Sequence, residues 1–295
     1  MIRAALLLLA ALLTAPLQAQ PLRLLDDSGH EVVLERPAQR IVSIAPHITE
    51  LLFAAGAGDR IVGVDEHSDY PAAAQKLPRI GRHASLDLEA IVALQPDLVI
   101  GWASGNRMPQ LARLADLGIP LYLNEIRDID DIATSIETMG RLTGSTGAAG
   151  VAARLRARAD AIAARPQPRL RLSVFYQIWE RPLMTVNGAH LISQAIDLCG
   201  GYNVFADLPT LAPTVGIESV LAADPQVIFA AGSSAQNPGW LTHWRQWSKL
   251  AAVRSDNLFA LNPDIVQRPT PRFLDGVEAM CDALDAARSK HPSSD

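Results

Sequence analysis

The residues able to carry chemistry are scattered and match no catalytic arrangement. The chain contains no GxSxG elbow, HExxH helix, Walker loop or GxGxxG turn after its first strand. A metal-ion receptor needs three or four converging His, Asp or Glu ligands, and His67 and His83 have no evident third partner. We therefore predict no catalytic residues, no metal centre and no resident cofactor, and expect a binding protein rather than an enzyme. Turnover of a bound ligand would contradict this.

The two cysteines of the chain, Cys199 and Cys281, offer a different chemistry. In an exported protein two thiols usually pair, and a loop of this length would stabilise the fold by ~4–5 kcal/mol on the chain-entropy model. Two separate buried thiols are the alternative. Metal ligation by this pair is disfavoured because the chain has no CxxC spacing.

The N-terminus predicts export. Arg3 precedes an apolar run from Ala4 to Leu13, Pro16 breaks the run, and Ala19 offers a small residue before a cut. This pattern indicates a signal peptide at residues 1–19, with an apolar core too short to span a bilayer. A buried N-terminal helix is the alternative. No Cys lies near the cut for a lipid anchor, so we expect a soluble periplasmic monomer without membrane insertion.

Length and charge narrow the class further. The 295 residues, 49% hydrophobic and 19% charged, suggest two lobes of ordinary globular composition. The net charge of −5 argues against nucleic acid as a partner, because a nucleic-acid surface needs clustered Lys and Arg.

The elements that must position any site alternate between strand and helix. A hairpin is expected at Leu22–Leu34, around the turn residues Asp26–Gly29. Strands are expected at 40–45, 61–64, 98–102, 121–123, 172–176, 227–231 and 258–261, and helices at 49–55, 89–94, 108–117, 129–143, 148–165, 191–198 and 273–288. Such alternation is typical of βαβ units with parallel sheets, so the predicted fold class is α/β.

A weak internal repeat supports two similar lobes. Glu89 and Glu218 each precede a proline by seven residues, and each proline precedes a strand; the two acids lie 218 − 89 = 129 residues apart. The alternative is that both segments share only a common sequence pattern, in which a proline separates a helix from a strand.

Several segments, taken in order, resemble a known family. They are Arg40–Pro46 with Thr49 and Glu50, Ser68–Pro71, Leu88–Trp102, Cys199–Gly201 with Asn203 and Phe205, and Asp264 with Arg268, Pro271 and Arg272. Together they resemble the periplasmic cobalamin-binding proteins, members of the solute-binding family whose lobes are joined by one long rigid helix. The resemblance covers nearly the whole mature chain.

The resemblance implies an architecture and a partner. It implies an N-terminal lobe at 20–147, a backbone helix at 148–165 and a C-terminal lobe at 166–295, each lobe with a mostly parallel sheet. It implies that Cys199 and Cys281 form a disulfide. It also implies that the transported ligand is cobalamin or a related corrinoid. The receiving partner is an inner-membrane ABC importer, and Glu89 and Glu218 resemble acids that dock on arginines of its permease subunits. Alternatively, both acids are solvated residues favoured by the helix dipole.

The resemblance also implies a cleft between the lobes. Trp102, Asp264 and Arg268 match positions that contact the ligand, with Tyr70 and Trp179 as neighbouring candidates. The alternatives are a core Trp102, a local Asp264–Arg268 ion pair, and structural roles for Tyr70 and Trp179.

Two histidines depart from the resemblance, because His67 and His83 stand where the cobalamin-binding proteins have aromatic residues. Their imidazoles could hydrogen-bond the ligand or ligate its metal, or they could be surface histidines. Because of this departure, the alternative function is that of a haem or ferric-siderophore receptor with the same fold.

Overall fold

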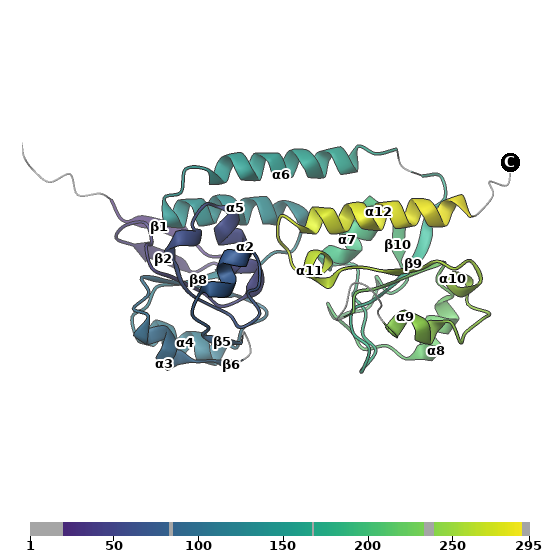
Figure 1. Ribbon diagram of the computed structural model, residues 1–295, viewed down its shortest axis with the longest axis horizontal. Coiled ribbons are helices and arrows are strands. Elements are labelled where there is room, and N and C mark those ends of the chain that lie inside the picture. Colours follow the sequence, from purple (N-terminus) through teal and green to yellow (C-terminus); the bar gives the residue numbers. More distant parts are fainter. Residues whose placement is uncertain (1–19, 83–84, 167, 233–238, 291–295) are drawn as a thin grey trace, which may run out of the picture.

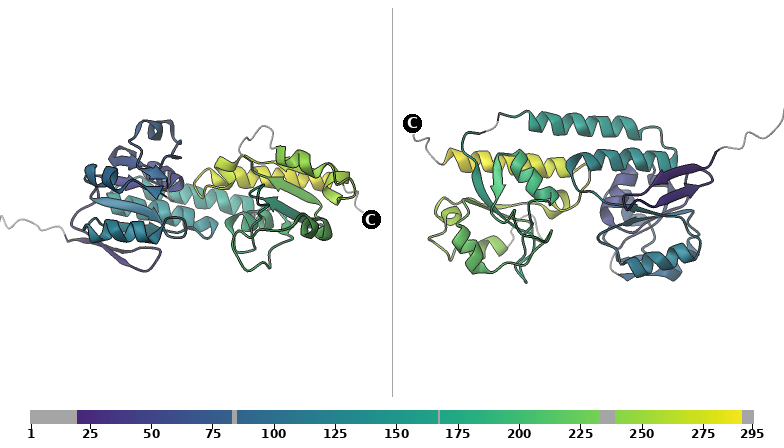
Figure 2. Two further views of the ribbon diagram at one scale, coloured as in Figure 1. Left: turned by 90° about the horizontal axis from the view of Figure 1, so that it is seen from below. Right: turned by 180° about the vertical axis from the view of Figure 1, so that it is seen from behind.

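The computed structural model describes residues 20–82, 85–166, 168–232 and 239–290. The predicted signal peptide and His83 lie outside these ranges. Two α/β lobes stand side by side, and helix α6 (Ala148–Ala163) runs along one side of the molecule across both of them (Figures 1 and 2). In the part of the chain that the structure describes, no helix is long and apolar enough to cross a membrane.

The first lobe is built on a parallel sheet in the order β4-β3-β7-β8. Its strands are β3 (Ile41–Ser43), β4 (Ile61–Val64), β7 (Leu98–Trp102) and β8 (Leu121–Asn124), and its α-helices are α2 (Pro46–Ala54), α3 (Leu88–Ala93), α4 (Met108–Asp116) and α5 (Ile129–Thr143). Two antiparallel hairpins, β1 (Leu22–Leu25) with β2 (Glu31–Leu34) and β5 (Gly81–Arg82) with β6 (Ser85–Leu86), and 3-10 turns at Gly58–Arg60 and Ala72–Lys76 complete it.

The second lobe repeats this arrangement with a parallel sheet in the order β10-β9-β11-β12. Its strands are β9 (Leu172–Gln177), β10 (Gly201–Asn203), β11 (Val227–Ala230) and β12 (Leu258–Ala260). Its helices are α7 (Leu191–Leu198), α8 (Ile217–Ala223), α9 (Gly239–Trp244), α10 (Ala251–Arg254), α11 (Pro263–Val266) and α12 (Phe273–Ser289).

The two lobes have the same strand order, so the internal repeat is structural. Counted in chain order within each lobe, the second strand lies at one edge, and the first, third and fourth follow across the sheet. The repeat extends to the backbone: Gln95 and Asp224, 129 residues apart (224 − 95), both have positive φ (48° and 39°) immediately before a proline. This agrees with the offset between Glu89 and Glu218.

Apolar side chains cover both faces of each sheet, as parallel strands require. On β3, Ile41 packs into the core beneath the long helices, while Val42 packs into a separate cluster with Val99 and Leu111 on the opposite face. In the second lobe, Phe175 and Ile228 build the corresponding outer cluster.

A layer of long helices joins the lobes. Helix α5 begins with a capping box between Asp128 and Asp131 and ends at Gly144, whose φ of 70° suits glycine. Gly140 lets α6 approach α5 closely, because a Cβ there would lie 2.4 Å from the Cβ of Ala148.

Helix α6 is tied to both lobes by two arginines that are two residues apart in the sequence. Arg156 forms ion pairs with Asp130 and Glu137 of α5, at 2.7 and 2.6 Å. Arg158 pairs with Asp275 and Glu278 of α12, both at 2.7 Å. The predicted fold class, two parallel-sheet lobes joined by one long helix, is confirmed.

Some predicted element boundaries were wrong. The helix expected from Thr49 begins at Pro46, because proline suits the first helical position. The helix expected to reach residue 165 ends at Ala163. No helix was expected between residues 262 and 271, but this proline-rich segment contains α11, in which the Asp264 N–H donates to Asn262 Oδ1 at 3.0 Å.

The cysteines are paired, as the sequence indicated. Cys199 at the end of α7 forms a disulfide with Cys281 in α12. The bond joins residues 82 apart and fastens α12 to its own lobe.

Candidate ligand-binding site

The carboxyl ends of the two sheets approach each other between the lobes. In the first lobe, Glu50 lies in the helix after β3 and Asp69 in the loop after β4. Both contact arginines that follow β12 in the second lobe, Arg268 and Arg272. Ligands of open α/β sheets bind beyond the carboxyl ends of the strands. We therefore take the loops at these facing ends, called the inter-lobe site below, as the candidate site.

Glu50 anchors an ion cluster at this site. Its carboxylate is buried, with 2% of the side chain exposed. The guanidinium of Arg272 donates to both of its oxygens, from Nη2 to Oε1 at 2.6 Å and from Nε to Oε2 at 2.9 Å. Arg268 approaches the same Oε1 at 3.4 Å. A buried carboxylate needs such partners, because an uncompensated charge away from water is costly.

Arg268 lies among three carboxylates. It pairs with Asp69 across the lobes, with Glu50, and with Asp264 one helical turn before it at 3.1 Å. Partial burial alone would raise the pKa of Asp69, but the hydrogen bond and charge of Arg268 outweigh it and hold that pKa below its usual value. The Asp264–Arg268 ion pair, which was the alternative to a ligand role for these residues, is therefore present, as part of a larger inter-lobe ion cluster (Glu50, Asp69, Asp264, Arg268 and Arg272).

Tyr70 extends the cluster with an aromatic face. The guanidinium carbon of Arg272 lies 3.9 Å from the centre of the Tyr70 ring, at cation–π distance. The ring remains 46% exposed, so it covers the arginine and still offers apolar surface.

Trp102 ends β7, the strand next to β3 at the centre of the first sheet. Its backbone N–H donates to Asn106 Oδ1 at 2.6 Å, and its half-buried ring meets the His47 ring edge-on at 5.3 Å. A Cβ on Gly105 would lie 1.9 Å from the indole, so the following loop packs directly against the ring. These contacts fix an indole at the carboxyl end of the first sheet.

Trp179 also lies near a strand end, in the second lobe two residues after β9, and is 56% exposed. Its ring meets Trp240 of α9 edge-on at 6.1 Å. Beside this pair, His243 Nδ1 lies 2.8 Å from Glu180 Oε1. Sequence reasoning missed Trp240, Glu180 and His243, because short α9 carries no periodic signal that would place it beside β9.

His67 is not part of the ion cluster. Its side chain is exposed, and its backbone N–H donates to Asp65 Oδ1 at 2.8 Å in the loop after β4. Among the described residues, no group of three or more His, Cys, Asp or Glu side chains could hold a metal ion. Thus Tyr70, Asp264 and Arg268 come together, while Trp102 and Trp179 stand at strand ends of opposite lobes.

The two repeated acids lie away from the ion cluster. Glu89 and Glu218 are exposed in the first turns of α3 and α8. These helices occupy equivalent places in the two lobes, on the side of the molecule opposite α6 (Figure 1).

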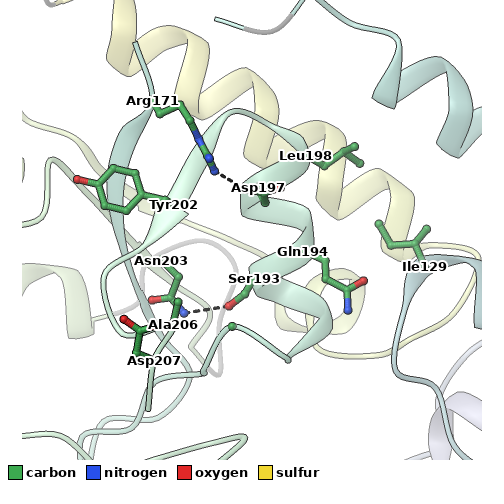
Figure 3. Close-up of a pocket in the computed structure, with 11 residues that line it drawn as sticks. Ile129, Arg171, Ser193, Gln194, Asp197, Leu198, Tyr202, Asn203, Ala206 and Asp207 are labelled. Atoms are coloured by element: carbon green, nitrogen blue, oxygen red, sulfur yellow. Dashed lines mark hydrogen bonds and ion pairs between the residues drawn. The ribbon is translucent and has the colours of Figure 1, made fainter. Parts of the chain in front are cut away.

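A groove of about 660 Å³ lies along α7 and β10 of the second lobe (Figure 3). Its lining includes Arg171, Ser193, Gln194 and Tyr202, and Ile129 borders it from the first lobe. None of the predicted site residues lines it, so we do not assign the ligand to this groove.

Comparisons with known proteins identify the class. The model of a family described as periplasmic binding protein matches residues 41–265. A vitamin B12-binding protein of Vibrio cholerae is 40% identical over 256 residues, covering 86% of this chain and 92% of that protein. A vitamin B12-binding protein of Yersinia pseudotuberculosis is 34% identical over 286 residues, covering 96% and 92%.

Solved structures agree in fold. The crystal structure of the periplasmic vitamin B12-binding protein of Vibrio cholerae superposes with a TM-score of 0.78 at 40% identity, covering 85% of this chain and 98% of that one. A periplasmic haem-binding protein of Roseiflexus sp. RS-1 matches with a TM-score of 0.72 at 25% identity, covering 85% and 99%. These relatives are binding proteins for vitamin B12 or haem, which agrees with the prediction of a binding protein. The chain belongs to the periplasmic binding protein family.

Proposed function

We propose that this protein captures cobalamin or a related corrinoid in the periplasm and delivers it to an inner-membrane ABC importer. The observation that carries the proposal is the 40% identity to a vitamin B12-binding protein over 86% of the chain, against 25% to the haem-binding protein. The corrinoid is cargo, held during transport and then released, and not a resident cofactor.

The inter-lobe site has the chemistry that such a ligand needs. Trp102 and Trp179, at strand ends of opposite lobes, offer apolar cover for the broad faces of a corrin ring. Between the lobes, the ion cluster supplies charged donors and acceptors for the amide groups at the ring edge. A mostly apolar site with a few polar groups is typical of small-ligand binding.

Calorimetry of the purified mature protein tests the ligand. Titration with cyanocobalamin, dicyanocobinamide and haemin should show one tight site for a corrinoid and much weaker binding of haemin. Tight haemin binding with a Soret band, and no heat from either corrinoid, would replace the proposal with a haem receptor. That alternative is kept because the haem-binding structure shares the fold at 25% identity.

We further propose that Glu89 and Glu218 dock the protein on permease arginines. Both acids are exposed, both stand in the first turn of a short helix, and both helices lie on the same side of the molecule. One acid in each of two similar lobes suits a pair of permease subunits that each present an arginine. Such charges steer and orient an encounter more than they add affinity.

Charge reversal tests the docking. Glu89→Arg combined with Glu218→Arg should abolish stimulation of the transporter ATPase and leave corrinoid affinity unchanged, because like charges would then face the permease arginines. A matched control is Glu35→Arg with Asp282→Arg, which makes the same charge change beside β2 and in α12. Loss of corrinoid affinity in the Glu89/Glu218 variant would mean that these acids line the ligand site instead.

A further inference from the structure

Two of the three carboxylates of the inter-lobe ion cluster are more exposed than its guanidiniums, while the third, Glu50, is buried. The side chains of Asp69 and Asp264 are 55% and 46% exposed, whereas those of Arg268 and Arg272 are 19% and 21% exposed. The surface offered to a ligand therefore consists mainly of hydrogen-bond acceptors, although the cluster contains two cations.

The cluster also carries a net negative charge. Its three carboxylates and two guanidiniums sum to 2 − 3 = −1. Both arginines are engaged: Arg272 with the buried Glu50, and Arg268 with all three acids. An incoming carboxylate would have to displace one of these partners.

This charge arrangement separates two classes of tetrapyrrole. The amide side chains at the ring edge of a corrinoid are uncharged, and their N–H groups can donate to exposed carboxylates. Haem carries two propionates, which would meet Asp69 and Asp264 as like charges, and like-charge contacts are a recognised means of rejecting a wrong partner.

We propose that Asp69, held in place by Arg268, is a specificity-determining residue that excludes carboxylate-bearing tetrapyrroles from the inter-lobe site. Asp264 reinforces it from the opposite lobe. This inference rests on the proposed corrinoid function. It explains how a protein with this fold binds a corrinoid and excludes haem.

Asp69→Asn tests the inference, since it removes the charge and keeps an acceptor oxygen. Affinity for haemin should rise by about tenfold, a shift that corresponds to removing one unfavourable charge contact. Affinity for haemin dimethyl ester, whose propionates are uncharged, should not rise, and neither should affinity for cyanocobalamin, whose amides would meet a weaker acceptor at residue 69. Asp69→Asn with Asp264→Asn should raise haemin affinity further, while Glu35→Gln, outside the cluster, should leave all three unchanged.

The outcomes separate this inference from the proposed function. Tight cyanocobalamin binding with haemin affinity no higher in Asp69→Asn than in the wild type overturns the inference alone. An equal rise for haemin and its dimethyl ester also overturns it, because the effect would then not depend on the ligand carboxylates. Absence of corrinoid binding by the wild type overturns both.

Discussion

At the scale of single residues, Trp102 and Arg268 have different contacts, and this predicts different effects on ligand binding. Trp102→Ala should weaken cyanocobalamin binding by ~2 kcal/mol, because a well-packed aromatic contact is lost. Arg268→Ala should cost less, since Arg272 still compensates the buried Glu50 through two hydrogen bonds. Calorimetry on both variants measures the difference.

The control for this comparison is Trp247→Ala, which removes an indole in the second lobe that borders a separate groove with Leu221 and Lys249. Its corrinoid affinity should equal that of the wild type. A larger loss for Arg268→Ala than for Trp102→Ala would mean that polar contacts, not apolar cover, dominate the site.

The sequence could indicate only part of the site. Trp102 lies at the end of a strand, and Asp264 lies one helical turn before Arg268. Both placements depend only on residues close together in the sequence, so the sequence could indicate them. Glu50 and Asp69 were not predicted as site residues, because their partners lie far along the chain: Glu50 and Arg272 are 222 residues apart, and Asp69 and Arg268 are 199 apart. Only the packing of one lobe against the other brings such pairs together.

At the scale of elements, the N-cap of α7 predicts acid sensitivity. The N–H of Ile192 donates to His190 Nδ1 at 3.1 Å, and burial lowers the pKa of His190 from about 6.5 to about 4. Protonation would turn Nδ1 into a donor and break this cap. Because the unfolded chain binds the proton first, stability is retained above about pH 6.5 and lost as pH falls towards 4.

Urea unfolding at pH 7 and 4.5 measures this effect. His190 should account for about 2 kcal/mol of the stability lost by the wild type. The His190→Asn variant, whose Asn side chain can cap the helix but does not titrate, should lose correspondingly less stability between pH 7 and 4.5 than the wild type. His67→Asn, at an exposed histidine, should keep the wild-type pH dependence. Equal acid losses in all three proteins would show that His190 is not the group responsible.

Elements with local end signals were predictable, but some short elements without such signals were not. Helices α5 and α7 have the predicted bounds, because α5 has its own capping box and αL glycine and α7 ends at Cys199-Gly200. Strand β10 has three residues, Gly201–Asn203, and no alternating pattern; pairing with β9 defines it. Helix α11 has four residues and depends on the Asn262 cap.

At the scale of the whole molecule, the connection between the lobes predicts limited motion. Helix α6 is bound to α5 through Arg156 and to α12 through Arg158, and Glu50 ties the lobes again through Arg272. A continuous helix bends little. Small-angle scattering of the mature protein should therefore give nearly the same radius of gyration with and without cyanocobalamin. A large contraction would require a hinge that these contacts do not provide.

The central claim is that one corrinoid binds between the lobes, and cobalt itself can locate it. In crystals grown with cyanocobalamin, anomalous scattering at the cobalt absorption edge should show a single peak between the lobes, flanked by Trp102 and Trp179 and close to the inter-lobe ion cluster. A cobalt peak in the groove along α7 and β10, or on the outer face of either lobe, would contradict the claim, as would crystals without bound cobalt at saturating ligand.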